Sequence, residues 1–342
     1  MADSSGRAIL LVNLGSPDEP TVPAVRRYLR QFLMDGRVLD VPWPLRKFIV
    51  EALILPRRPQ KTAAAYQSIW TPEGSPLVAI SRRVRDKLAQ QIGVPLGLGM
   101  SYGEPSIRSA LEDSQNGGEP TRELLLIPMY PHYAMSTYET TVVAVREAIR
   151  RWAPKMQLTV LPPFYDDSAY ITALTESASE WLKRPYDHLL FSYHGLPERH
   201  LRKTDPTGNH CLSRTDCCRV PSAAQSTCYR AQVLRATEAF VRQAGVPEGK
   251  YSIAFQSRLG RDRWLGPDTE HELVGLAQNG VRNLAVICPS FVADCLETLE
   301  EIGLDGRDAF LAAGGREFHL IPCLNDHPAW IAALAGWCRR PW

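Results

Sequence analysis

A histidine stands at the end of a predicted strand, where it could take part in proton or metal chemistry. In the stretch HLLFSYHGLPERH, residues 188–200, an apolar run leads to His194, and Gly195 and Pro197 break the strand directly after it. An imidazole has a reference pKa of about 6.5, so near pH 7 its neutral form can accept a proton or bind a metal. The alternative is a histidine that is simply buried in the core.

Carboxylates recur at helical spacing further along the chain. In CPSFVADCLETLEEIGL, residues 288–304, we expect a helix that begins after the proline and ends at Gly303. Asp294, Glu297 and Glu301 would then lie on one helical face, at i, i+3 and i+7. Such a row could accept protons or guide a cation. The alternative is the solvated acidic face of a surface helix.

Four of the eight cysteines lie close together in the sequence, and in a reducing compartment such clustering favours a metal site over disulfides. They are Cys211, Cys217, Cys218 and Cys228. Their spacing matches neither the paired CxxC knuckles of a zinc ribbon nor a plant-type ferredoxin loop. From the residues alone, zinc, a [2Fe–2S] cluster and free thiols stay open. We expect the other cysteines to be small buried side chains: Cys288, Cys295, Cys323 and Cys338.

Apolar runs that alternate with helical patterns must position these groups. The predicted strands are 8–17, 123–133, 158–165, 188–197, 251–260 and 283–291. The predicted helices include 22–34, 77–92, 136–153 and 169–184. Continuously apolar strands between helices imply parallel sheets that are covered on both faces. We therefore predict an α/β protein with two packed, doubly wound parallel-sheet domains. A closed (β/α)8 barrel is the alternative.

The predicted domain limits follow from the order of these runs. Residues 1–160 would form an N-terminal Rossmann-like domain, with an apolar lip near 39–59. A C-terminal Rossmann-like domain would follow at 161–306, with the cysteines in an insertion at 208–230. Residues 307–342 would pack back on the N-terminal domain.

The composition excludes several classes of protein. The chain has 342 residues, of which 44% are hydrophobic, and a net charge of +2. It has no basic block that would suit nucleic acid, no apolar run long enough to span a bilayer, and no GxGxxG or GxxxxGK phosphate loop. The first residues carry no secretory signal pattern, so we expect a cytoplasmic protein, and peripheral contact with the inner face of the cell membrane is a further expectation.

A series of motifs in fixed order resembles the ferrochelatase family over residues 8–330. They are LLVNLGSP, YQSIWTPEGSPL, MSYGEPSI, PMYPHYAMST, FSYHGLPERH, FQSRLGRDRWLGP and CPSFVADCLETLEEI. The family is a group of lyases that insert Fe²⁺ into protoporphyrin IX with loss of two protons, the last step of haem biosynthesis. The resemblance thus implies two Rossmann-like domains with the porphyrin cleft between them, and protoporphyrin IX and ferrous iron as the substrates. The alternatives are a chelatase for another tetrapyrrole or metal, such as coproporphyrin or cobalt, and a non-catalytic haem-binding or iron–sulfur protein.

The resemblance also implies roles for individual residues. His194 and Glu297 match the family's active-site pair, which meets the substrate iron, while Asp294 and Glu301 match acidic positions on a proton or metal route. It stays open whether the histidine accepts protons or first receives the metal. The residues that match the porphyrin side of the cleft are Leu14, Arg58, Tyr66, Tyr133, Gln256, Ser257 and Trp264.

Two positions depart from the family pattern. Ser101 stands where many members have an arginine, so no propionate or metal role is carried to it. Cys295 stands where some members have a histidine, so no ligand role is carried to it either.

Arg58 is the predicted partner of a propionate, because a guanidinium can hold a carboxylate with two hydrogen bonds.

The same resemblance also implies roles for the clustered cysteines and for the apolar lip. Some bacterial members carry a [2Fe–2S] cluster on an internal cysteine insertion at this place, which implies a cluster with a structural or sensing role here. The lip flanks the cleft mouth in the family and can touch a membrane; an ordinary core helix is the alternative. Its residues are Trp43, Leu45, Phe48, Ile49, Leu53, Ile54 and Leu55, and its rim is Arg46, Lys47, Arg57 and Arg58. A second copy of the chain is a further candidate partner.

Overall fold

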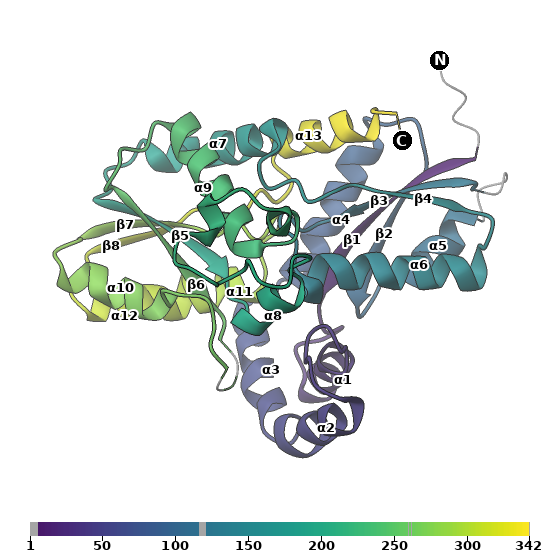
Figure 1. The fold of residues 1–342 in the computed structure, drawn as a ribbon, viewed down its shortest axis with the longest axis horizontal. Coiled ribbons are helices and arrows are strands. Elements are labelled where there is room, and N and C mark those ends of the chain that lie inside the picture. Colours follow the sequence, from purple (N-terminus) through teal and green to yellow (C-terminus); the bar gives the residue numbers. More distant parts are fainter. Residues whose placement is uncertain (1–5, 116–120, 259, 261, 342) are drawn as a thin grey trace. The chain divides into compact units, whose positions relative to one another are not determined.

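Two four-stranded parallel sheets are formed by the residues that the computed structural model describes, 6–115, 121–258, 260 and 262–341 (Figure 1). Each sheet is open, because its two outer strands pair on one side only. The predicted α/β class with two parallel sheets is confirmed, and the alternative of a closed barrel is wrong. The strands of the first sheet, in the order β2-β1-β3-β4, are β1 Arg7–Gly15, β2 Leu96–Tyr102, β3 Glu123–Pro128 and β4 Gln157–Val160.

The second sheet repeats this topology in the order β6-β5-β7-β8. Its strands are β5 His188–His194, β6 Tyr251–Gln256, β7 Asn283–Ile287 and β8 Glu317–Leu320. The chain leaves β5 toward one neighbour and later returns to the other, so the carboxyl end of β5 is a topological switch point. In open α/β sheets this is where ligands bind.

Helices cover both faces of each sheet because successive strand residues point to opposite sides. In β1, Leu10 and Val12 pack in one core with Val145 of α6. In the second sheet, Leu190 packs with Phe310 of α12, while Phe191 meets the ring of Phe240 of α9 from the opposite face. Figure 1 accordingly has α10 and α12 on one side of the second sheet and α7 and α9 on the other.

The helices follow in chain order. In the first half they are α1 Val22–Leu33, α2 Trp43–Phe48, α3 Arg58–Ile69, α4 Pro76–Ala89, α5 Ile107–Gln115 and α6 Thr140–Trp152. In the second half they are α7 Ser168–Leu182, α8 Glu198–Lys203, α9 Tyr229–Ala244, α10 Thr269–Gln278, α11 Leu296–Leu299, α12 Arg307–Ala312 and α13 Pro328–Cys338. Wider π-helical turns occupy Ile49–Ile54, Met135–Glu139 and Glu301–Gly306, and short 3₁₀ turns occupy Cys217–Arg219 and Ala223–Ser226.

Two strands escaped prediction from the sequence. Strand β2 carries Gly97 and Gly99, residues that usually weaken a strand. Both glycines are explained by close packing: a Cβ at Gly99 would lie 3.2 Å from the Cα of Ile107 in α5. Strand β8 is a short edge strand of four residues with only partly buried side chains, so it lacks the apolar run that marked the others.

The chain divides into two compact units, and their limits differ from the predicted ones at the C-terminus. One unit holds Met1–Tyr130, Met135–Pro162 and Ile331–Trp342, and the other holds Pro131–Ala134 and Pro163–Trp330. The expectation that all of 307–342 packs on the N-terminal domain is therefore wrong for 307–330. The reason is that β8 pairs with β7 and so belongs to the second sheet.

The predicted acidic helix is also different in the structure. Residues 289–295 are not helical, and α11 begins only at Leu296. Helical structure does not end at Gly303, which lies inside the π-helical turn that leads into α12. Asp294 therefore precedes the helix, and only Glu297 and Glu301 remain at helical spacing.

The predicted apolar lip is partly exposed. Trp43 and Phe48 of α2 expose 57% and 58% of their surfaces, and Leu45 and Leu53 are exposed as well, so an ordinary core helix is excluded for these four side chains. Leu55, by contrast, is buried. Arg46 does not face outward as a rim cation, because its guanidinium donates to the carbonyls of the preceding loop at Met34, Leu39 and Val41.

No helix within the described ranges is both long and apolar enough to cross a bilayer.

Candidate active site

His194 is the last residue of β5 and lies at the switch point of the second sheet. It pairs in register with Gln256, the last residue of β6. The next residue, Gly195, donates its N–H to the Gln256 carbonyl at 2.7 Å, and a Cβ at Gly195 would lie only 2.7 Å from that oxygen. The ring of Trp264 closes the other side at 3.3 Å. Only glycine fits here, which explains why the strand turns directly after the histidine.

The imidazole of His194 is held in one tautomer. Its Nδ1 lies 2.7 Å from the Gly195 carbonyl oxygen. Because a carbonyl can only accept, Nδ1 carries the hydrogen and Nε2 of the neutral ring keeps its lone pair. Phe291 faces the imidazole edge-on at 6.1 Å, and the backbone N–H of His194 donates to Ser290 Oγ at 3.0 Å. The ring is half-buried and has one nitrogen available for chemistry.

Glu301 is clamped to the end of the neighbouring strand. Its carboxylate accepts the Ser257 N–H at 2.7 Å and the Ser257 hydroxyl at 2.5 Å. Ser257 has a positive φ of 66°, a conformation rare outside glycine and frequent at functional sites. The same turn lets both donors of Ser257 point at one carboxylate.

The electrostatic surroundings of Glu301 connect it to the histidine. Burial raises the pKa of Glu301, and repulsion from Glu297 adds to this rise, while the Ser257 hydrogen bonds and attraction to His194 oppose it. The carboxyl group therefore holds a proton more readily than an exposed glutamate. A carboxyl group of raised pKa beside an imidazole is a suitable pair for proton transfer.

The raised pKa of Glu301 predicts a pH-dependent stability. Stability that comes from a raised folded pKa is present at low pH and is lost as the pH rises through the folded pKa. In the Glu301→Gln variant this loss is absent, so its free energy of unfolding should increase relative to the parent between about pH 5 and about pH 8. Urea denaturation at both pH values measures this. Glu270→Gln, at an exposed position of α10, is the control, and an equal response of both variants would contradict the expectation.

The side chain of Gln256 is buried and holds neighbouring residues in place, so it presents no surface to a porphyrin. It is 2% exposed, its side-chain oxygen accepts the Ser192 hydroxyl at 2.7 Å, and its amide nitrogen donates to the Glu297 carbonyl at 2.7 Å. Ser257 is likewise occupied by Glu301. The structure thus gives both residues of the predicted polar pair a role in holding the two glutamates.

The carboxylate of Asp294 is occupied by hydrogen bonds within the protein. Its carboxylate accepts from the Thr298 hydroxyl at 3.1 Å, the Cys323 N–H at 3.2 Å and the Asn325 amide at 2.6 Å. It is also buried. The expectation that Asp294 shares a helical face with the glutamates is wrong, because its carboxylate ties the turn before α11 to the loop after β8.

The other predicted porphyrin contacts lie at scattered positions. Leu14, in β1, is half-buried, and Arg58, at the start of α3, is exposed, while Tyr66 is 6% exposed and packs edge-on against Trp70. Tyr133 and Trp264 are half-buried. Trp264 is the one of these that lies against the turn after His194.

Ser101, at the position of the family arginine, is part of a small polar cluster. Its hydroxyl lies 2.7 Å from the Thr141 hydroxyl and 3.5 Å from that of Tyr130. Desolvation raises the pKa of Tyr130 to about 12, so this group stays neutral. The cluster contains no cation that would replace the arginine.

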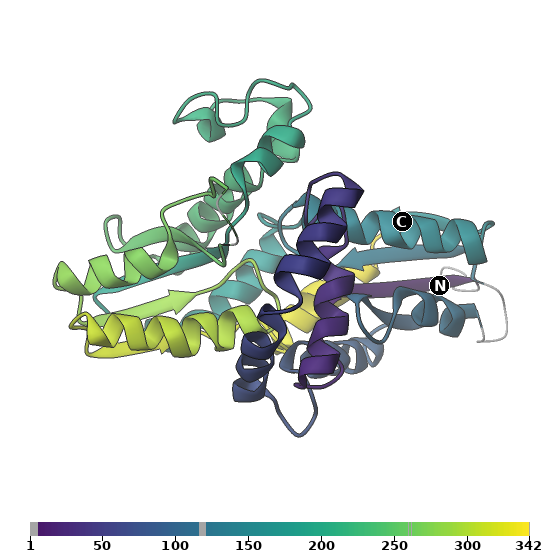
Figure 2. The same cartoon turned by 90° about the horizontal axis from the view of Figure 1, so that it is seen from below.

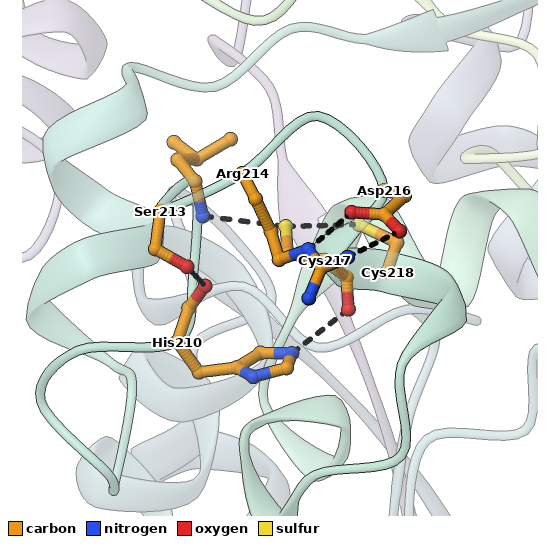
Figure 3. A network of polar contacts seen from close by, with 7 residues as sticks. His210, Ser213, Arg214, Asp216, Cys217 and Cys218 are labelled. Carbon is orange, nitrogen blue, oxygen red and sulfur yellow. Dashed lines mark hydrogen bonds and ion pairs between the residues drawn. The ribbon is translucent and has the colours of Figure 1, made fainter.

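The four clustered cysteines come together in a loop that follows α8, and Figure 2 shows this segment standing out from the second sheet. Cys217 and Cys218 have their Sγ atoms 3.9 Å apart (Figure 3). The Cys218 and Cys211 thiols both hydrogen-bond to Cys228. The hydrogen bond from Cys218 is the strongest of the influences that lower the pKa of Cys228.

These sulfurs form hydrogen-bonded pairs rather than a closed coordination shell. Across the described part of the chain, no group of three or more His, Cys, Asp or Glu side chains is already arranged to hold a metal ion. One backbone N–H group does point at a sulfur: Leu212 donates to Cys217 Sγ at 3.4 Å. Such bonds stabilise negative charge on sulfur.

Asp205 organises the loop that carries the cysteines. Its carboxylate accepts the N–H groups of Thr207, His210 and Cys211, each at 2.8 Å. Desolvation alone would raise the pKa of Asp205, but these bonds together hold it well below its usual range. The loop is thus built around one buried negative charge.

Sequence reasoning missed two residues that hydrogen-bond to His194, and it gave no role to His132. Tyr229 donates its hydroxyl to the His194 carbonyl at 2.9 Å, and Ser290 accepts the His194 N–H. His132, in the YPHY motif, packs edge-on against the rings of Tyr193 and Tyr229, both at 5.5 Å. The motifs that hold Ser290 and His132 were noted in the sequence, but nothing in them indicates which residue faces the histidine.

Comparison with known proteins decides the family. A family model described as Ferrochelatase matches residues 6–341. The chain belongs to the ferrochelatase family. It is 54% identical to the ferrochelatase of Azotobacter vinelandii over 98% of both chains, and 52% identical to that of Pseudomonas fluorescens (strain Pf0-1) over 97% of both. The prediction of a ferrochelatase, a lyase, is confirmed.

The fold comparison agrees with this family. The structure of SirB from Bacillus subtilis with Fe³⁺ superimposes with a TM-score of 0.53, at 13% identity, over 97% of this chain and 94% of that one. At this identity the likeness establishes a common fold alone. The ferrochelatase family and SirB therefore share the two-sheet architecture described above.

Proposed function

We propose that this chain inserts Fe²⁺ into protoporphyrin IX, with His194 as the acceptor of a pyrrole proton. The observation that carries the proposal is the position of His194, whose Nε2 keeps its lone pair, at the switch point of the second sheet, beside the end of β6 at which Ser257 holds Glu301. His194 ends β5, and Glu301, which begins the π-helical turn Glu301–Gly306, is held by the backbone N–H of Ser257 after β6.

The reaction requires acceptors for two protons. Fe²⁺ replaces two pyrrole N–H hydrogens, and the porphyrin nitrogens keep both electron pairs as Fe–N bonds form. His194 Nε2 takes one proton. Glu301 takes the proton on from the imidazole, or takes the second, because its raised pKa favours the neutral acid. Ser257 keeps its carboxyl group in place throughout.

Glu297 is the second group that would meet the iron. Its carbonyl is fixed by Gln256, and its carboxylate accepts a hydrogen bond from the buried Cys295 thiol, while its side chain is only half-buried. A carboxylate and an imidazole can together replace water ligands of Fe²⁺ as it enters the ring. Phe291 and Trp264 supply aromatic surface for the macrocycle beside them. Leu14, Arg58 and Tyr66 in the first unit, and Tyr133, stay predictions as porphyrin contacts.

Anaerobic incubation with ferrous iron tests the function directly. Protoporphyrin IX fluorescence should fall as iron enters the ring, with release of about two protons per porphyrin in weakly buffered solution. Coproporphyrin III, assayed in parallel, tests the choice of substrate, and the higher kcat/KM identifies it. Binding of protoporphyrin with no proton release would instead identify a non-catalytic porphyrin-binding protein.

The four cysteines are proposed to hold a [2Fe–2S] cluster. Four cysteine side chains in one loop are the kind of donor set that such a cluster takes, and the Sγ atoms of Cys217 and Cys218 lie 3.9 Å apart. When bound, the cluster would cross-link the loop, and it supplies no electron to iron insertion, which involves no net redox change. Its role would be structural or sensing, and a colourless protein that contains zinc and no sulfide would contradict the assignment.

The exposed lip is proposed to touch the inner face of the cell membrane. Trp43, Leu45, Phe48 and Leu53 present apolar surface, and the Lys47 ammonium lies over the Trp43 ring at 5.1 Å. Aromatic and aliphatic side chains beside cations suit the interface of an anionic bilayer. Cosedimentation with anionic vesicles measures this contact, and a homodimer built on the same patch would be seen instead by light scattering.

A further inference from the structure

We propose that Ser101 and the uncharged groups around it select protoporphyrin IX over coproporphyrin III, by accepting a vinyl group and rejecting a propionate at the end of the first sheet. The inference deepens the proposed function and rests on it, because Leu14, the residue beside Ser101, is a predicted porphyrin contact. Coproporphyrin III carries propionates at the two ring positions where protoporphyrin IX carries vinyl groups. The two molecules therefore differ in charge along one edge of the macrocycle.

The carboxyl end of β1 is the switch point of the first sheet. The chain leaves β1 toward β2 on one side and later returns as β3 on the other. In open α/β sheets ligands bind at such a point. Asn13 of β1 pairs in register with Met100 of β2, so the next residues along the two strands, Leu14 and Ser101, lie opposite each other. This pair ends the sheet at the place where a ligand is expected.

Leu14 and Ser101 point to the same face of the sheet. Val12, two residues before Leu14, packs in one core with Val145 of α6. Ser101 faces α6 as well, because its hydroxyl lies 2.7 Å from Thr141 Oγ1 in that helix. Both Leu14 and Ser101 are only half-buried, so each keeps some surface that a ligand can touch.

The groups that contact the Ser101 hydroxyl are uncharged. Apart from Thr141, which is fully buried, the contact is the Tyr130 hydroxyl at 3.5 Å. Burial raises the pKa of Tyr130 to about 12, so the phenol is neutral near pH 7. Within the described ranges, no lysine or arginine side chain hydrogen-bonds to any of these three hydroxyls. A carboxylate placed here would find hydroxyl groups but no cation.

A carboxylate of the protein itself lies next to this group. Asp35, in the loop after α1, accepts the Tyr102 hydroxyl at 2.9 Å and the Thr140 hydroxyl at 3.1 Å. Tyr102 follows Ser101 in the chain, and it is close enough to Tyr130 for the two phenols to influence each other electrostatically. The surface beside Ser101 is therefore bordered by a negative charge.

The cation nearest to Asp35 in the sequence does not compensate this charge. The guanidinium of Arg37 donates to the Glu139 carboxylate at 3.2 Å, so these two charges cancel and Asp35 leaves one net negative charge. A propionate would bring a second anion to a partly desolvated surface that offers it no cation, which is unfavourable. A vinyl group carries no charge and can pack on Leu14. Repulsion of the wrong group is a common source of specificity.

Porphyrin affinity measured without iron tests this assignment. In fluorescence titrations the parent should bind protoporphyrin IX at least about tenfold more tightly than coproporphyrin III. Ser101→Arg supplies a guanidinium, which can hold a carboxylate with two hydrogen bonds, and should reduce this affinity ratio at least about fivefold. Ser101→Met adds a long side chain without charge and should not reduce the ratio. Gln90→Arg adds the same charge at the exposed C-terminal end of α4, ahead of β2, and should leave the ratio within about twofold of the parent.

A substitution that adds no bulk gives an independent test. Asp35→Asn keeps an oxygen for the Arg37 N–H and a polar group for the Tyr102 and Thr140 hydroxyls, but removes the negative charge. It should reduce the affinity ratio about threefold through tighter binding of coproporphyrin III. This measurement decides the matter even where Ser101→Arg does not fold, as circular dichroism would show.

The outcomes distinguish this inference from the proposed function. A parent protein that inserts Fe²⁺ into neither porphyrin overturns the proposed function, while the affinity ratios still test the role of Ser101. Equal affinity of the parent for the two porphyrins, equal effects of Ser101→Arg and Ser101→Met, or an unchanged ratio in Asp35→Asn overturns the assignment.

Discussion

The His194→Ala variant is expected to bind protoporphyrin with little change and to insert Fe²⁺ about a thousandfold more slowly. The imidazole is the group whose Nε2 can take a pyrrole proton, since Nδ1 is committed to the Gly195 carbonyl. Alanine leaves Glu301 clamped to Ser257, because that carboxylate is held from the backbone and not by the histidine. Stopped-flow fluorescence under anaerobic conditions gives the insertion rate, and equilibrium quenching gives the porphyrin affinity.

The matched control is His188→Ala. His188 lies at the opposite end of the same strand, where its Nε2 contacts Ser252 Oγ at 2.9 Å. Its replacement should leave the insertion rate within about twofold of the parent. Added imidazole should restore part of the rate in His194→Ala and have no effect on the parent. A rate within threefold of the parent in His194→Ala, or a loss of porphyrin binding without loss of rate, would contradict the assigned role.

The Cys217→Ser variant is expected to lose the visible absorption of the proposed cluster completely and to unfold at a lower temperature. Cys217 is 1% exposed, and its sulfur accepts the Leu212 N–H, so a hydroxyl would both weaken iron binding and disturb the loop. Cross-links that join distant loop residues typically stabilise a protein by a few kcal/mol. Absorption spectra, iron and sulfide analysis, and thermal unfolding measure the two effects.

A substitution that keeps all four thiols gives a second test of the proposed cluster. Asp205→Asn removes the charge around which the loop is hydrogen-bonded, and it should lower the cluster content although no ligand is lost. Asp216→Asn is its control, because Asp216 lies in the same loop but is paired with Arg214 at the surface. Equal cluster content in Cys217→Ser and the parent would show that this cysteine is not a ligand.

Much of the site could be predicted because parallel α/β sheets place function at strand ends. The apolar run before His194 and the glycine after it were enough to place the imidazole beyond the sheet, and the pairing of His194 with Gln256 follows from two runs of that kind. Ser257 was indicated by its match to the porphyrin side of the family's cleft. Its role as the anchor of Glu301 depends on a positive φ at a serine, which no residue pattern indicates.

The sequence-based predictions that failed concern residues whose structural partners are distant in sequence. Asp294 fits a helical face by spacing, yet its carboxylate is satisfied by Cys323 and Asn325, about thirty residues away, and this pulls it out of helical geometry. Strand β8 escaped notice because four partly buried residues carry too little apolar signal. Tyr229 could not be connected with His194, since no local pattern predicts a contact across 35 residues.

The bonds of Asp294 also determine what holds the carboxylates of the site still. The turn before Glu297 is fastened to the segment that follows β8, which is the outermost strand of its sheet and has a neighbour on one side only. Edges of sheets are where local opening begins. Local opening at that edge would release the turn before Glu297 while the rest of the fold stays intact, so we expect loss of activity to precede global unfolding.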